Sequence, residues 1–109
     1  MSWFKEQGIN KGRKALKRLF RNDLKVTNHF VVRLYQRFSV EERRSIVREL
    51  YEIVKSGMAY SLFVPGEIDA AGFRVALVTV GNKHRMALAI QDNQLVIKTI
   101  YTPGRNRNV

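Results

Sequence analysis

The chain has 109 residues, which is enough for one hydrophobic core, and a hydrophobic share of 45% excludes a disordered chain. With 20 Lys and Arg against nine Asp and Glu, the formal net charge is +11, an excess that favours an acidic partner such as nucleic acid. The chain lacks Cys, which excludes disulfides and thiolate metal sites, and no apolar run approaches the roughly 20 residues of a membrane span. We therefore expect a single-domain, cytoplasmic protein without a membrane span.

The first segment, residues 1–25, is predicted to be a basic arm with an amphipathic helix over residues 11–22. Four apolar residues share one face of this helix: Ala15, Leu16, Leu19 and Phe20. The opposite face is basic and carries Arg13, Lys14, Lys17 and Arg18. We expect the apolar face to pack on the core and the basic face to contact nucleic acid. Lying on a membrane surface is an alternative for the same helix.

A second helix is predicted over residues 27–38, with Thr27 as its N-cap. Its apolar side carries Phe30, Val31, Leu34, Tyr35 and Phe38. Its polar side carries His29, Arg33, Gln36 and Arg37. Because a helix turns once in about 3.6 residues, these four polar side chains fall in a narrow sector and are presented together.

A third helix begins with a capping box, Ser39 followed three residues later by Glu42, and ends at Ser56-Gly57. The pattern then changes to strands, predicted over residues 59–64, 73–80, 85–91 and 95–102. Short turns make the last three strands an antiparallel meander. The fold class is α+β, with N-terminal helices packed on one face of a four-stranded antiparallel sheet. We expect this domain to span residues 26–102 and residues 103–109 to be a mobile basic tail.

The chain has two histidines, so any imidazole acid–base chemistry near neutral pH uses one or both. His29 shares its helix face with Arg33 and Arg37, which are placed to hold a phosphate while the imidazole moves a proton. The alternative is an exposed histidine near a helix start with no catalytic role. His84 follows a Gly-Asn-Lys turn, where a solvated loop histidine is the simpler interpretation.

The last strand carries two hydroxyl side chains, Thr99 and Tyr101, which alternation places on one face together with Ile97. Thr and Tyr are also favoured simply as strand formers. No group of His, Asp or Glu has the spacing of metal ligands, so we expect no metal and no small-molecule cofactor. A nuclease without a metal would use the 2′-hydroxyl of its substrate as nucleophile, and only RNA supplies one.

The run from Thr27 to Ser39 is followed by a capped helix, a meander and a closing Lys98-Thr99-Ile100-Tyr101. This pattern resembles the barnase/RelE-like ribonuclease toxin superfamily. Within it, the similarity is to small domains that open with a Thr-x-His-x-x-x-Arg-x-x-x-Arg helix and close on a Thr-x-Tyr strand. The resemblance covers about residues 26–102. It implies a barnase/RelE-like fold whose concave sheet face binds RNA, and metal-independent cleavage that leaves a 2′,3′-cyclic phosphate.

The resemblance also implies roles for the candidate residues. His29 would act as general base or acid, and Arg33 and Arg37 would stabilise the charge of the phosphorane. Thr99 and Tyr101 would position the phosphate. His84 departs from the family pattern as a second, loop-borne imidazole, and it is a further candidate for proton transfer. Further RNA contacts are expected from the basic residues of the arm and of the meander: Arg13, Lys14, Lys17, Arg18, Lys83, Arg85 and Lys98.

Two other functions fit the same composition. One is a basic RNA- or DNA-binding protein that does not cleave, in which the arm and tail hold the phosphates. The other is an interaction module whose basic face binds an acidic protein. A ribonuclease toxin would itself be expected to have an acidic antitoxin or immunity protein as a partner.

Overall fold

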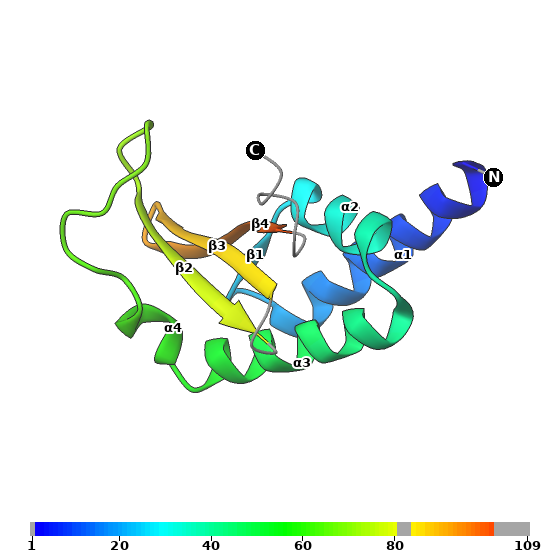
Figure 1. Ribbon diagram of the computed structural model, residues 1–109, viewed down its shortest axis with the longest axis horizontal. Helices are drawn as coiled ribbons and strands as arrows, with labels where there is room; N and C mark the ends of the chain where they lie inside the picture. Colours follow the sequence, from blue (N-terminus) through cyan, green and yellow to red (C-terminus); the bar gives the residue numbers. More distant parts are fainter. Residues whose placement is uncertain (1, 81–83, 102–109) are drawn as a thin grey trace.

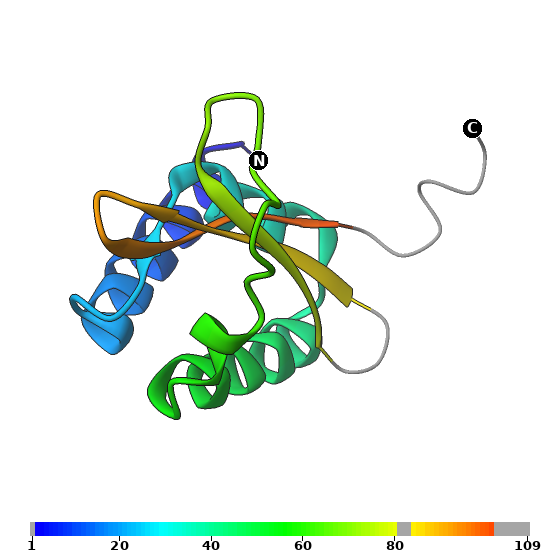
Figure 2. The same ribbon diagram turned by 90° about the vertical axis from the view of Figure 1, so that its left-hand side faces the viewer.

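The helices lie on one side of a twisted sheet (Figures 1 and 2), in a computed structural model that describes residues 2–80 and 84–101. The helices are α1 (Ser2–Phe20), α2 (Asn28–Arg37), α3 (Val40–Lys55) and α4 (Met58–Ser61). The strands are β1 (Lys25–Val26), β2 (Arg74–Val80), β3 (His84–Gln91) and β4 (Gln94–Tyr101). The sheet order is β1-β4-β3-β2, so the fold is α+β as expected.

The core lies between the helices and one face of the sheet. Its largest fully buried side chains come from α1, α2, α3, both central strands and the segment between α1 and β1, and they are Phe20, Leu24, Phe30, Val31, Leu34, Ile46, Leu50, Met86, Leu88, Leu95, Ile97 and Ile100. In the described part of the chain, no helix is both long and apolar enough to cross a bilayer.

The helix of the basic arm is longer than predicted, because it begins at Ser2 instead of residue 11. Leu16 and Phe20 are buried in the core, which confirms that this helix docks on it. The other two residues of the predicted apolar face, Ala15 and Leu19, are exposed.

The caps of the next two helices are confirmed. The Thr27 hydroxyl accepts a hydrogen bond from the backbone N–H of Phe30 at 3.2 Å, and α2 starts after it. Ser39 and Glu42 exchange both bonds of a capping box, with the Ser39 N–H donating to the Glu42 carboxylate at 2.9 Å. The third helix ends at Lys55, just before Ser56-Gly57. These local signals fix where α2 and α3 begin.

The strand predicted over residues 59–64 is wrong, because Met58–Ser61 forms the short helix α4. The buried side chains there are Ala59 and Phe63, which are four residues apart, so the segment packs with helical spacing. The fourth strand is instead β1, which pairs in parallel with β4 through Lys25–Val96 and Val26–Ile97. The sheet is therefore mixed and not purely antiparallel.

The predicted meander of β2, β3 and β4 is confirmed, and it contains a bulge. Ala87 faces Thr99, but its neighbour Leu88 faces Ile97, so Lys98 is an extra residue in β4. The bulge reverses the alternation of the strand. Ile97 and Ile100 are both buried in the core, whereas simple alternation places Ile97 beside Thr99.

Candidate active site

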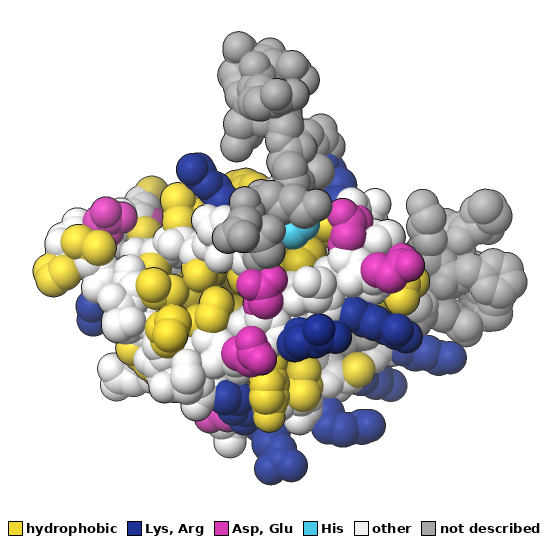
Figure 3. Space-filling model, turned by 60° about the horizontal axis from the view of Figure 1, so that its bottom comes forward, with side chains coloured by type: hydrophobic (Ala, Val, Ile, Leu, Met, Phe, Trp, Pro, Cys, Tyr) yellow, Lys and Arg dark blue, Asp and Glu magenta, His cyan; other side chains and the backbone are white. Residues whose placement is uncertain are grey.

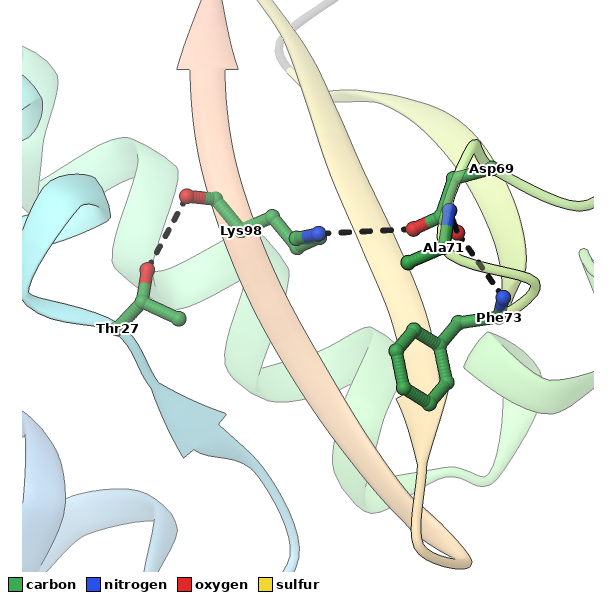
Figure 4. Close-up of polar contacts among 5 residues, drawn as sticks. All are labelled: Thr27, Asp69, Ala71, Phe73 and Lys98. Carbon is green, nitrogen blue, oxygen red and sulfur yellow. Dashed lines mark hydrogen bonds and ion pairs between the residues drawn. The ribbon is translucent and has the colours of Figure 1, made fainter.

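A hydrogen bond from Thr27 joins the start of α2 to the bulge of β4 (Figure 4). The Thr27 hydroxyl donates to the carbonyl oxygens of Ile97 at 2.9 Å and Lys98 at 3.1 Å. The same oxygen accepts from the N–H of Phe30, so one side chain caps the helix and ties it to the strand. His29 lies two residues after Thr27, and Thr99 one residue after Lys98. The structure thus brings together the two segments that carry the candidate residues.

The part of β4 that follows the bulge has an open edge beside α2. Strand β1 pairs only with Val96 and Ile97, so within residues 2–80 and 84–101 no strand pairs with residues 98–101 on that side. Helix α2 follows β1 directly in the chain and packs against β4. On this edge the carbonyl oxygen of Lys98 is already bonded to the Thr27 hydroxyl.

Helix α2 carries the residues predicted for its polar face. His29 is exposed in the first turn, and Arg33 and Arg37 follow at intervals of one turn, both half-buried. The guanidinium of Arg13, on α1, donates a hydrogen bond to the side-chain oxygen of Asn28 at 2.6 Å, across 15 residues of chain. Its other terminal nitrogen donates to Asn10 at 2.6 Å. These two bonds hold the Arg13 guanidinium beside Asn28, the residue before His29.

The hydroxyl residues of β4 line a cavity on the face of the sheet that points away from the helices. This outer cavity has a volume of about 430 Å³. Its lining residues are Glu67, Asp69, Val75, Ala76, Leu77, Ala87, Lys98, Thr99 and Tyr101. Thr99 is half-buried, Tyr101 is 40% exposed, and the predicted pairing of these two side chains on one face is observed. The bulge adds Lys98 to the same cavity.

Asp69 fixes the ammonium group of Lys98 (Figure 4). One carboxylate oxygen of Asp69 accepts from the backbone N–H groups of Ala71 and Phe73, each at 2.9 Å. The other lies 3.6 Å from Lys98 Nζ. The hydrogen bond from the Phe73 N–H is the main cause that holds the pKa of Asp69 below its ordinary value. The Ala71 N–H and the Lys98 charge also lower this pKa, and partial desolvation opposes them. The loop before β2 is therefore attached to β4 by an ion pair.

His84 lies apart from this arrangement. It is the first residue of β3 and only 5% exposed, so the prediction of a solvated loop histidine is wrong. Its ring packs edge-on against Phe38, with centroids 5.0 Å apart. It faces Val80, a core residue, and thus points to the helix side of the sheet, opposite Thr99 and Tyr101. The structure does not bring His84 to the outer cavity.

The other predicted RNA contacts are distributed over two surfaces. Lys14, Lys17 and Arg18 are exposed on α1. Arg85 is exposed on β3 directly opposite Tyr101. Lys83 lies outside the described residues. A hydrogen bond holds Arg13 and an ion pair holds Lys98 near the junction of α2 and β4.

Three residues of the site were not predicted, namely Asn28, Glu67 and Asp69. Asn28 lies in the run from Thr27 to Ser39, and it could have been predicted as a site residue because it is the polar neighbour of His29. Asp69 precedes Ala71 and Gly72 in a pattern typical of an Asx turn, but the sequence does not indicate that this loop returns to β4. Among the described residues, no three His, Asp, Glu or Cys side chains form a group able to hold a metal ion.

No protein-family model, curated protein or solved structure matches this chain.

Proposed function

We propose that the protein is a metal-independent endoribonuclease with a barnase/RelE-like fold, and that its active site lies where α2 meets β4. The observation that carries this proposal is the bond between the Thr27 hydroxyl and the Lys98 carbonyl. It joins the helix of His29, Arg33 and Arg37 to the strand of Thr99 and Tyr101, which are the residues to which the resemblance assigns the reaction.

His29 is the proton-transfer group in this proposal, because it is the exposed one of the two histidines. Its imidazole removes the proton from a ribose 2′-hydroxyl, and the 2′-oxygen attacks the adjacent phosphorus. The bond from phosphorus to the 5′-oxygen then breaks, and that oxygen takes up a proton. The products are a 2′,3′-cyclic phosphate and a free 5′-hydroxyl.

The phosphate is placed beside α2 and not inside the outer cavity. The cavity contains Glu67 and Asp69, which repel a phosphate, and among the described residues that line it Lys98 is the one cation. The α2 side offers Arg13 and Arg33 together with the N–H groups at the start of the helix, of which that of Phe30 is already capped by Thr27. Arg33 and Arg37 stabilise the charge that develops on the phosphorane. The cavity, with Thr99 and Tyr101, then receives the sugar and base of a neighbouring nucleotide.

A second candidate function is RNA binding without cleavage, and the position of His84 favours it. Ribonucleases of this class commonly use one group to remove a proton and another to deliver one, whereas His84 is buried on the other face of the sheet. In the ribonuclease proposal, the phenol of Tyr101 or a water molecule protonates the 5′-oxygen. A binding protein would need neither group.

The two functions are separated by incubating the protein with RNA in EDTA and identifying the fragment ends. Fragments with 2′,3′-cyclic phosphate, absent when the substrate carries 2′-deoxyribose, are expected of the ribonuclease. RNA that remains intact but shifts on a native gel would establish the binding protein instead. An acidic protein as the sole partner would be indicated by binding that persists at high salt and does not compete with RNA.

A further inference from the structure

A groove runs along the surface between α1 and α3, away from the α2–β4 junction. Two adjoining hollows of about 520 and 610 Å³ form it, and they share Ala15, Leu19 and Tyr51. Gly12, Val40 and Val47 extend the apolar floor at the other end. Several of these side chains are unusually open for their type, with Leu19 39%, Val40 51% and Tyr51 36% exposed. We call this surface the α1/α3 groove.

The two helices run side by side in the same direction along the groove. Near one end, Gly12 and Val40 line the same hollow. Further along, the rings of Phe20 and Tyr51 are 6.0 Å apart, and Lys55 forms an ion pair with Asp23 just beyond α1. The groove therefore follows α1 for about two helical turns from Gly12 to Leu19, at about 1.5 Å per residue. This shape accommodates a third helix laid between the two.

Among the described residues, every charged side chain that lines the groove is basic. The cations are Arg18, Arg21, Arg43, Arg44, Arg48 and Lys55. Arg43 is already held, because its guanidinium lies 4.3 Å from the centre of the Tyr35 ring and donates to the Phe38 carbonyl at 2.8 Å. Figure 3, which brings the α3 side forward, shows Lys and Arg side chains with hydrophobic ones between them on this face. The groove thus combines an apolar floor with a cationic border.

We propose that the α1/α3 groove binds an acidic amphipathic helix of a partner protein. The apolar stripe of such a helix would cover Leu19, Val40 and Val47, and its flanking carboxylates would meet the arginines along both sides. The proposal does not depend on the ribonuclease activity, because none of the catalytic candidates lines the groove.

Two other occupants fit the groove less well. A second copy of the chain would bring its own basic residues of α1 and α3 against these arginines, and the like charges repel. An RNA backbone would pair with the arginines but would leave the apolar floor facing sugar and phosphate, with Leu19 and Val40 still in contact with water.

The test uses a synthetic helical peptide with Leu at helical spacing and Glu on both flanks, and a control peptide of the same composition with the Leu stripe broken. Binding is measured by calorimetry, and the site is mapped from backbone amide shifts in NMR spectra. We expect the stripe peptide to shift α1 and α3 amides. Leu19→Gln and Val47→Gln should each weaken the binding of the stripe peptide about tenfold or more. The double variant Arg44→Glu with Arg48→Glu should weaken this binding to the same extent.

The matched control is Arg85→Glu, which removes the same kind of charge from the outer face of the sheet and should leave the affinity within about twofold. Circular dichroism confirms that each variant is folded. Absence of binding, equal affinity for both peptides, or equal weakening by Arg85→Glu would overturn the proposal in favour of unspecific charge attraction. If Arg44→Glu with Arg48→Glu lowered the affinity for RNA and not the affinity for the peptide, the groove would be assigned to nucleic acid. Self-association lost on Leu19→Gln would assign it to a second copy.

Discussion

The hydroxyl of Thr27 donates to the carbonyl oxygen of Lys98 at 3.1 Å, across 71 residues of chain. Thr27 comes immediately before α2, and Lys98 is the extra residue of the β4 bulge. Because His29 and Thr99 follow these two residues closely, the bond sets the position of one candidate residue relative to the other. The stability of the junction and the geometry of the site therefore depend on the same side chain.

Replacing Thr27 tests this dependence. In Thr27→Ala the N-cap is lost and the carbonyls of Ile97 and Lys98 lose a donor, so we expect the free energy of unfolding to fall by about 1 to 2 kcal/mol in chemical denaturation. Thr27→Ser keeps the hydroxyl and should recover most of the loss. Equal destabilisation by both replacements would mean that the methyl group of Thr27, and not its hydroxyl, holds the junction.

Gly12 is expected to be intolerant of a side chain although it lies inside a helix. A Cβ atom at this position would overlap the ring and hydroxyl of Tyr35, which is itself covered by Arg43. We expect Gly12→Ala to destabilise the protein by about 1 to 3 kcal/mol, as overpacking does. Gly8→Ala is the control, because a Cβ at Gly8 meets nothing within 4 Å and helix propensity should then stabilise α1 by up to about 1 kcal/mol. Parallel thermal melts of the two variants would show opposite signs, and equal signs would contradict the packing at Gly12.

The backbone hydrogen bonds that Asp69 accepts from Phe73 and Ala71, together with its ion pair to Lys98, predict a dependence of stability on acid pH. Folding lowers the pKa of Asp69, so its contribution is fully present above the ordinary value of 3.8 and is lost as the pH falls through the lower folded pKa. The difference in unfolding free energy between the wild type and Asp69→Asn should be constant from neutral pH to about 4 and then shrink.

The control for this titration is Glu67→Gln, which removes another carboxylate from the same cavity without breaking the Asp69 contacts. Denaturation curves of the three proteins at a series of pH values provide the comparison. A wild-type advantage over Asp69→Asn that grows as the pH falls below 4 would contradict the lowered pKa.

His84 is expected to be a structural residue. Because it is buried against Phe38, His84→Gln should lower the free energy of unfolding by about 0.5 to 3 kcal/mol and leave the cleavage rate of the folded protein within a few-fold. The rate is measured at a temperature where the variant is fully folded. A variant of normal stability with no cleavage would instead return His84 to the reaction.

The elements that depend on local chemistry were predictable from the sequence. Thr27 caps α2, Ser39 with Glu42 begins α3, and the turn at Asp92-Asn93 closes a hairpin, where both residues adopt the positive φ angles that such turns require. Each of these signals acts over a few residues. They were sufficient for the α+β class and for the shared face of His29, Arg33 and Arg37.

The remaining features depend on contacts between distant segments. Strand β1 has two residues, too few for an alternating pattern, and only pairing with Val96 and Ile97 makes it a strand. The bulge at Lys98 leaves no mark in the sequence, so alternation placed Ile97 on the wrong face. His84 looked like part of a turn because burial against Phe38 is a tertiary contact.

In the proposed reaction, the α2–β4 junction cleaves RNA and His29 moves the proton. The most direct test is to compare the wild type, His29→Ala and Gln36→Ala on the same RNA in EDTA. Gln36 is the control because it is an exposed residue of the same helix. We expect the wild type and Gln36→Ala to leave 2′,3′-cyclic phosphate ends, and His29→Ala to bind RNA normally but to cleave about 10²-fold or more slowly. Cleavage by His29→Ala at the wild-type rate would contradict the role of His29. No cleavage by the wild type would contradict the ribonuclease activity itself.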